Sequence, residues 1–200
     1  NVPTVCPSEA EARRLAGAGS MLDDMVRLAR RNAPAQEIWI VSPAPVGTAE
    51  IRTLTIAAPP AAGGYGVIEI AGEPIGITIG AGDDDDAVAA ALASAINAYY
   101  NPFGEASLPF TATVATNVVT LTARHAGAHS TGVDIHVPVL DGSNALTGKV
   151  TQAVGTAGAG NPDLSTALAA LGDDPFDWIV SAFSDATNVG RYKTLLSDVS

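Results

Sequence analysis

The chain has 200 residues, which is enough for one large domain or two small ones. Hydrophobic residues make up 47% of it, so a packed core is expected, and the scarcity of aromatic residues leaves that core to Ala, Val, Ile and Gly. The formal charge of −11 opposes contact with phosphate backbones, which argues against nucleic acid as a partner.

A short helix is expected near the N-terminus. Ser8 and Glu11 have the spacing of a capping box, in which a serine at the helix start is followed three residues later by a glutamate. The helix should run to about residue 16, because the sequence Gly17-Ala18-Gly19-Ser20 then interrupts it.

A second helix and a buried strand follow. Ser20 can cap this helix, and Asn32-Ala33-Pro34 should end it. Residues 37–41 lack polar alternation, which predicts a strand with both faces covered. The apolar stripe of the second helix is expected to comprise Met21, Met25, Leu28 and Ala29.

The stretch from residue 49 to 156 has a different character, with strand-like patterns separated by turn signals. One helix is expected there after Asp83 to Asp86, with Val88, Leu92, Ile96 and Tyr99 on its apolar side. Residues 71–74 and 115–117 should be hairpin turns. Strands are expected at residues 50–57, 66–70, 75–79, 110–114, 118–122, 133–137 and 150–154.

Helical sequence returns near residue 160. Asn161 is an expected N-cap with Pro162 at the first helical position, and Asp185 should begin a last helix. Residues 176–180 between these helices are expected to form a second buried strand. The apolar face of the first of the two helices is expected to comprise Leu164, Ala167, Leu168 and Leu171.

The tetrapeptide WIVS, which occurs at residues 39–42 and 178–181, predicts the fold class. Each copy follows a helix and a polar turn, so the two are expected to be neighbouring parallel strands of one sheet, which need a long connection between them. The prediction is an α/β layer domain with parallel strands, α+β overall, formed by residues 1–48 plus 157–200. An inserted β-rich domain, residues 49–156, carries one helix and interrupts it.

The strand ends and the glycine-rich loops are the first candidate ligand sites. Ligands of open α/β sheets lie beyond the carboxyl ends of the strands, here Ser42 to Pro45 and Ser181 to Asp185. These segments are dominated by prolines and hydroxyls, and Asp185 is interpreted as a helix cap. The glycine-rich segments 17–20 and 155–160 lack the lysine of a phosphate-binding loop and are interpreted as turns.

The remaining chemically versatile residues are interpreted structurally. Asp83 to Asp86 suit a helix N-terminus, and His125, His129 and His136 do not have zinc spacing. Cys6 is the only cysteine, which rules out an intrachain disulfide and favours an intracellular history. We therefore expect no catalytic, cofactor-binding or metal-binding residues, no cofactor and no enzymatic activity. No apolar run is long enough to span a bilayer, so no membrane partner is expected.

Six segments occur in a characteristic order: residues 17–20, 37–39, 90–98, 119–127, 158–171 and 177–180. Taken together, these segments resemble the tail sheath proteins of Mu-like contractile-tailed phages and prophages. Their order and separation extend over almost the whole chain, although no single segment is diagnostic. The chain departs from the family pattern in residues 128–132 and 181–185.

The resemblance implies a structural subunit that stacks as rings of six around the tail tube and rearranges on contraction to drive the tube into the host. Its partners would be other copies of itself, in a helical array, and the tube. It would be located in the virion tail, after assembly in the bacterial cytoplasm. We expect the chain to be a piece of a longer protein, because it begins at Asn1 rather than Met and ends inside a predicted helix. Without the terminal arms, this piece is expected to be monomeric. The terminal arms and the tube-facing C-terminal domain of the family would lie outside it.

Two other functions stay open from the residues alone. An α/β hydrolase-like or nucleotide-binding domain with a β-rich lid predicts convergent titratable groups at the ends of the WIVS strands. A sugar- or surface-binding module predicts exposed aromatic side chains in the β-rich region, where the candidates are Tyr65, Tyr99, Tyr100 and Phe103.

Overall fold

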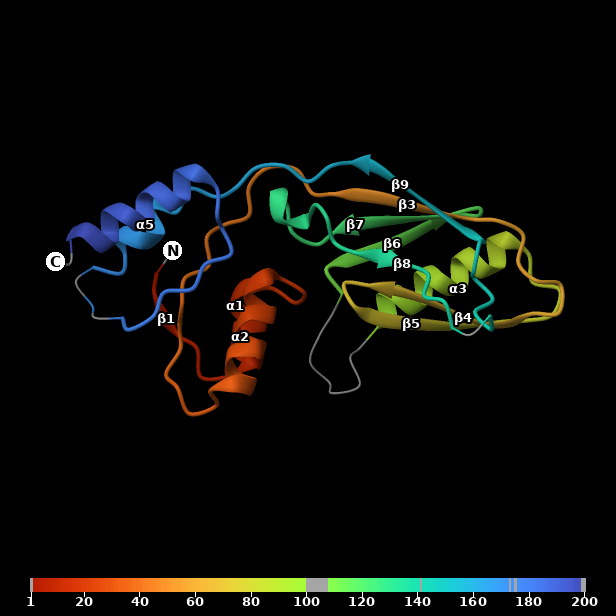
Figure 1. The fold of residues 1–200 in the computed structure, drawn as a ribbon, viewed down its shortest axis with the longest axis horizontal. Helices are drawn as coiled ribbons and strands as arrows, with labels where there is room; N and C mark the ends of the chain where they lie inside the picture. The colour runs from red at the N-terminus through yellow and green to blue at the C-terminus, as the bar shows by residue number, and fades with distance from the viewer. Residues whose placement is uncertain (1, 100–107, 141, 173, 175, 199–200) are drawn as a thin grey trace. The chain divides into compact units, whose positions relative to one another are not determined.

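Figure 1 shows the computed structural model of the chain, which describes residues 2–99, 108–140, 142–172, 174 and 176–198. It divides into two compact units, Asn1–Gly47 with Gly160–Ser200, and Thr48–Ala159. The sequence predicts domain boundaries at 48/49 and 156/157. Each unit has its own elements and is described separately.

The N-terminal part of the first unit contains two helices, α1 (Glu9–Ala16) and α2 (Met21–Asn32). Both begin as the sequence predicts, because the hydroxyl of Ser8 accepts the amide of Glu11 at 3.2 Å and that of Ser20 accepts the amide of Asp23 at 3.1 Å. The carboxylate of Glu11 does not complete the capping box; it pairs with Arg14.

The small core under these helices corrects the predicted stripe of α2. Val26 is buried and Leu22 packs beside it, whereas Leu28 and Ala29 of the predicted stripe are exposed. The helix turns this face inward because Asp23, one residue from Leu22, is buried and bonded to the amide of Gly19 and to Arg13. The buried members of the core are Cys6, Ala12, Val26 and Ile40.

The WIVS runs do not form the expected parallel pair. Trp39–Ile40 (β2) pairs antiparallel with Thr4–Val5 (β1), and residues 178–181 are not in a strand. Trp39 of the first run lies edge to face with Phe176, two residues before the second run, with ring centroids 6.2 Å apart. Trp178 is 88% exposed and Val180 77% exposed, so the second run lacks the covering layers that stabilise a central parallel strand.

The C-terminal part of the first unit contains α4 (Ser165–Ala169) and α5 (Ala186–Asp198). The last helix begins after Asp185, as predicted, with the Asp185 carboxylate accepting the amide of Asn188 at 3.1 Å. The helix α4 begins later than predicted, and Asn161 does not cap it. Its first turn is held by Asp163, which accepts the amide of Ser165 at 2.7 Å.

The second unit has two antiparallel sheets and one long helix. The four-stranded sheet has the order β6 (Phe110–Ala115), β7 (Val118–Ala123), β3 (Ile51–Ile56), β9 (Val150–Thr156). The three-stranded sheet has the order β5 (Glu73–Ile79), β4 (Gly64–Ile70), β8 (Ile135–His136). Both predicted hairpins form, β4–β5 and β6–β7. The turn of the β4–β5 hairpin is formed by Ala71 and Gly72, which both have positive φ.

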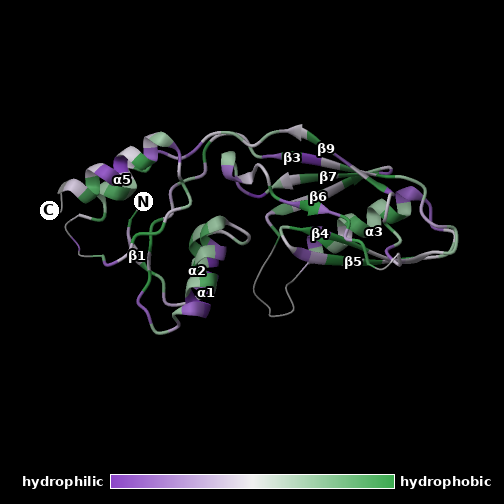
Figure 2. Cartoon of the chain, in the orientation of Figure 1, coloured by the Kyte–Doolittle hydropathy of each residue, from purple (hydrophilic) through white to green (hydrophobic). Residues whose placement is uncertain are grey.

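One core lies between these sheets and α3 (Asp85–Ala98). The helix begins at Asp84, whose carboxylate accepts the amide of Ala87 at 2.8 Å, and Figure 2 shows its largely hydrophobic colouring. Val88, Leu92 and Ile96 are buried as predicted. The largest fully buried side chains of this core are Phe110, Leu54, Ile56, Ile68, Ile70, Leu92, Ile96, Leu108, Leu121 and Leu146.

The two ends of the second unit are joined by hydrogen bonds. Thr48 donates its amide to the carbonyl of Ala159 at 2.9 Å and accepts the amide of Ala159 at 3.1 Å. This isolated antiparallel bridge brings the entering and leaving segments of the unit side by side.

Every strand pair in the described residues is antiparallel. The parallel, layered α/β arrangement therefore stays a prediction.

Candidate functional site

A shallow groove of about 290 Å³ lies along α5, beside the end of the second WIVS run. Ile179, Phe183 and Val189 give it an apolar lining, and Tyr192 donates a hydrogen bond to the hydroxyl of Ser181. Of its lining residues, only Tyr192 has a titratable side chain. This part of the described structure therefore lacks the pair of convergent titratable groups that a hydrolase-like or nucleotide-binding site predicts.

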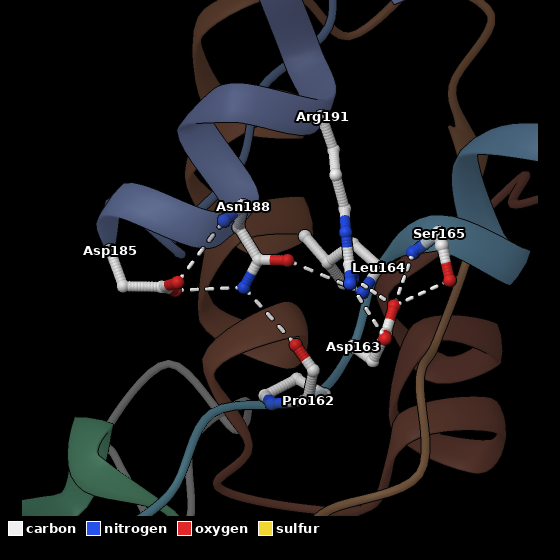
Figure 3. Close-up of polar contacts among 7 residues, drawn as sticks. All are labelled: Pro162, Asp163, Leu164, Ser165, Asp185, Asn188 and Arg191. Atoms are coloured by element: carbon white, nitrogen blue, oxygen red, sulfur yellow. Dashed lines mark hydrogen bonds and ion pairs between the residues drawn. The ribbon is translucent and has the colours of Figure 1, made fainter. Parts of the chain in front are cut away.

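Next to this groove, a cluster of polar contacts holds the segment before α4 against α5 (Figure 3). Asn188 is buried, and its amide group bonds three partners. Its Oδ1 accepts the amide of Leu164 at 3.3 Å, and its Nδ2 donates to the carbonyl of Pro162 at 3.1 Å and to Asp185 at 2.7 Å. These bonds from Asn188 lower the pKa of the Asp185 carboxyl, the backbone amide of Asn188 having the largest effect.

An exposed ion pair completes the cluster. Arg191 binds both oxygens of Asp163, with 2.7 Å between Nη2 and Oδ2, and Asp163 also accepts from the amide of Ser165 (Figure 3). The bidentate geometry orients both side chains. Because these polar groups bind one another, the arrangement is that of a structural anchor between two segments of the first unit.

The two glycine-rich segments are occupied by contacts within the chain. The amide of Gly19 donates to Asp23 at 3.1 Å, so a buried carboxylate takes the place where a phosphate would bind. Gly158 lies against the turn at residues 127–131, where an added Cβ would be 2.6 Å from the carbonyl oxygen of Gly127. Both segments therefore act as packed turns in the structure.

The acidic run after β5 stabilises the start of α3. Asp83 accepts the amide of Gly80 at 2.6 Å, and Asp84 is the N-cap. Among the residues whose placement is described, no group of three or more His, Cys, Asp or Glu side chains could hold a metal ion. Cys6 is buried, its thiol donates to the carbonyl of Ser8, and burial raises the pKa of that thiol.

The three histidines fall into two places. His136 lies at the edge of the three-stranded sheet, 2.8 Å from Asp134 and 3.4 Å from Glu69. His129 lies in the turn at residues 128–130, where burial, and secondarily the charge of His125, lower its pKa from the ordinary 6.5. They do not form a shared site.

The lowered pKa of His129 predicts a dependence of stability on pH. The folded state favours the neutral imidazole, so the second unit should lose stability as the pH falls from 6.5 through the lowered pKa, because the unfolded chain then binds more protons. Denaturant unfolding of the second unit, followed between pH 7.5 and 5, should show this slope. His129→Gln should reduce this slope of stability against pH. The control His136→Gln should leave the contribution of His129 to the slope in place. An unchanged slope in His129→Gln would contradict the assignment.

Of the predicted receptor aromatics, the structure describes Tyr65 and Tyr99, and these two differ in exposure. Tyr65 is 57% exposed on β4, whereas Tyr99 is partly buried and donates to Glu73 at 2.6 Å. Burial and the Glu73 carboxylate raise the pKa of the Tyr99 phenol. Tyr100 and Phe103 lie outside the described residues.

Comparison with known proteins gives one informative relationship. Over 183 residues, or 90% of its length, the chain is 30% identical to the Mu-like prophage FluMu tail sheath protein of Haemophilus influenzae (strain ATCC 51907 / DSM 11121 / KW20 / Rd). The chain is a distant relative of a tail sheath protein. It spans 36% of the length of that relative. No protein-family model matches the chain.

This relationship supports the distant connection to tail sheath proteins that the sequence segments indicate. None of the helices that the structure describes combines the length and the apolar character needed to cross a membrane.

Three asparagines have structural roles that were not predicted from the sequence. Asn97, Asn144 and Asn188 each use both ends of the side-chain amide to bind backbone groups that are distant in sequence. A single asparagine outside a turn motif carries no local signal of such a role. The partners become visible only in the folded chain.

Proposed function

We propose that the chain is part of a structural subunit of a contractile phage tail sheath. In this proposal the subunit has no enzymatic role, stacks as hexameric rings around the tail tube, and rearranges on contraction to drive the tube into the host. The observation that carries the proposal is the 30% identity with a tail sheath protein over 90% of the chain. The partners are other copies of the subunit, and the tube through regions outside these residues. The subunit is located in the virion tail.

The way the polar groups of the structure are used supports a structural role for the subunit. The anchor around Asn188, the capped start of α3 and the packed glycine turns all use their donors and acceptors within the chain. Contraction is then a rigid-body movement between subunits, in which each unit keeps its internal fold.

The layered α/β arrangement is part of the same proposal. We propose that, in the assembled sheath, residues 176–180 become a strand beside Trp39–Ile40. The contact between Trp39 and Phe176 already brings the two runs together, and the exposure of Trp178 and Val180 leaves an apolar surface to be covered.

Electron microscopy of the full-length protein tests both statements. The expected result is tubes or stacked rings, and a map of them should show residues 176–180 hydrogen-bonded next to β2. Compact particles that turn over a substrate would overturn the sheath function. Sheath tubes in which the two runs lie in different sheets would overturn only the layered arrangement.

A further inference from the structure

The four sheet margins of the second unit are not equally protected. An open margin exposes unpaired N–H and C=O groups and invites another strand, so proteins usually block it. At the β6 margin, both ends of the Asn97 side-chain amide bind the backbone of the strand. At the β8 margin, the side chain of Gln152 donates to the carbonyl of Ile135 at 3.0 Å. Within the described part of the chain, the margins formed by residues 150–154 of β9 and 76–78 of β5 have no such block.

The ladder between β3 and β9 shows which groups of β9 point outward. The amide of Ala57 donates to the carbonyl of Lys149 at 2.7 Å, and bonding to one neighbour alternates along an antiparallel strand. Val150, Gln152 and Val154 therefore turn their N–H and C=O groups away from β3. No other described residue bonds these groups.

The margin of β5 is open in a similar way. The carbonyl of Tyr65 accepts the amide of Ala145 on the far side of β4, so Tyr65 and its cross-strand partner Thr78 do not bond each other. Thr78, and by alternation Gly76, therefore turn their N–H and C=O groups outward. Pro74 has the same orientation and offers only its carbonyl.

The two open margins lie on opposite sides of the second unit, β9 at the top and β5 at the bottom of this unit in Figure 1. Their surroundings differ in charge. Residues 143–162 contain no Asp or Glu, and Lys149, directly before β9, is their only charged side chain, in a chain of net charge −11. The acidic run Asp83–Asp86 follows the C-terminal end of β5. The β9 margin of one copy can therefore approach the β5 margin of another with attraction, although most of their surfaces repel each other.

The two margins also differ in shape. Tyr65 is 57% exposed, and its hydroxyl lies against Gly76, where an added Cβ would overlap it. A hollow of about 150 Å³ opens beside β9, where Val150 and Gln152 line it together with apolar side chains that include Leu54. The β5 margin thus carries an exposed aromatic side chain, and the β9 margin lies beside a hollow with apolar walls.

We propose that β9 of one copy pairs antiparallel with β5 of the next copy, so that copies join head to tail. In the register that uses the outward groups, Gln152 lies opposite Gly76. Val150 then lies opposite Thr78. The antiparallel direction places Lys149 beside the acidic run that follows β5, which a parallel pairing would not do.

The same register accounts for the exposed aromatic side chain. Residues directly opposite each other share one face of a sheet, so Gln152 opposite Gly76 puts the Tyr65 phenol on the face of β9 where the hollow opens. Because the two margins are different, the contact is heterologous and repeats in one direction, as rings of identically oriented copies require. The contact is short, so it forms when copies are held close together, which is where the inference rests on the proposed sheath function.

Disulfide trapping of mixed variants tests this pairing. Residues of a hydrogen-bonded antiparallel pair have Cα atoms about 5.5 Å apart, which a disulfide can span. Thr78→Cys and Val150→Cys chains, mixed and oxidised, should give at least five times more covalent dimer than either variant alone. Cys6 is buried and should not react. Val114→Cys, exposed on β6, is the control and should not be trapped by Val150→Cys. Equal yields from the mixture and the single variants, or equal trapping of the control, would overturn the proposal.

Charge and shape are tested on the same trapped dimer. Lys149→Glu should lower its yield at least threefold, whereas Lys193→Glu makes the same charge change in the first unit and should leave the yield unchanged. Tyr65→Ala should lower the yield as well, and the exposure of this side chain keeps the fold intact. A yield that survives either Lys149→Glu or Tyr65→Ala would contradict the proposed contact.

The double variant Thr78→Cys/Val150→Cys in the full-length protein separates this inference from the proposed function. Oxidised sheath tubes should give a ladder of covalent oligomers. Tubes without that ladder would overturn the pairing of β9 with β5 and leave the sheath function standing. A ladder from protein that never forms tubes would overturn the sheath function and leave the pairing standing.

Discussion

Replacing Phe110 by alanine is expected to lower the free energy of unfolding of the second unit by about 3–5 kcal/mol. Phe110 is fully buried at the start of β6, within the core that α3 and both sheets share. Alanine would remove most of a large apolar side chain and leave a cavity that the surrounding strands cannot fill. The measurement is denaturant unfolding followed by far-UV circular dichroism.

The control for this substitution is Val114→Ala. Val114 lies on the same strand but is 44% exposed, so its truncation should cost less than about 1 kcal/mol. Both tryptophans, Trp39 and Trp178, belong to the first unit, and tryptophan fluorescence therefore reports that unit alone. If Phe110→Ala lowered the free energy of unfolding by no more than Val114→Ala does, the described core would be contradicted.

Replacing Asn188 by alanine is expected to destabilise the first unit by about 2–4 kcal/mol. The substitution leaves the amide of Leu164 and the carbonyl of Pro162 without their side-chain partner, and both groups lie against α5. The segment before α4 should then separate from α5. Tryptophan fluorescence in denaturant measures the loss.

Asn161→Ala is the matched control, because Asn161 is exposed and makes one long bond of 3.3 Å to Asp185. Its effect should be within about 0.5 kcal/mol. Equal effects of the two substitutions would show that the anchor does not hold the segment. A loss confined to the second unit would contradict the division of the chain into two units.

Local signals predicted much of the secondary structure. Ser8 and Ser20 cap their helices with their own side chains, and the hairpin around Ala71 and Gly72 depends on neighbours in sequence. The expected start at Asn161 was wrong because α4 begins after Leu164, whose amide is bound by Asn188, a residue more than twenty positions away. Single-sequence rules contain no term for such distant partners.

The two WIVS runs show a second limit of prediction from sequence alone. An unbroken apolar run predicts burial, but whether layers cover it depends on segments elsewhere, and here Trp178 is exposed. The α2 stripe was misplaced for a related reason, because a buried aspartate, Asp23, lies on the inward face. The functional prediction came from the order of many short segments rather than from any chemical motif.

The bridge between Thr48 and Ala159 has a consequence for how such proteins diversify. Because the second unit leaves the rest of the chain and returns to it at adjacent positions, a short turn could replace the whole unit with little change in loop-closure entropy. A foreign domain with closely spaced termini could be grafted at the same point. Recombination can therefore exchange this unit among relatives while the remaining framework is conserved.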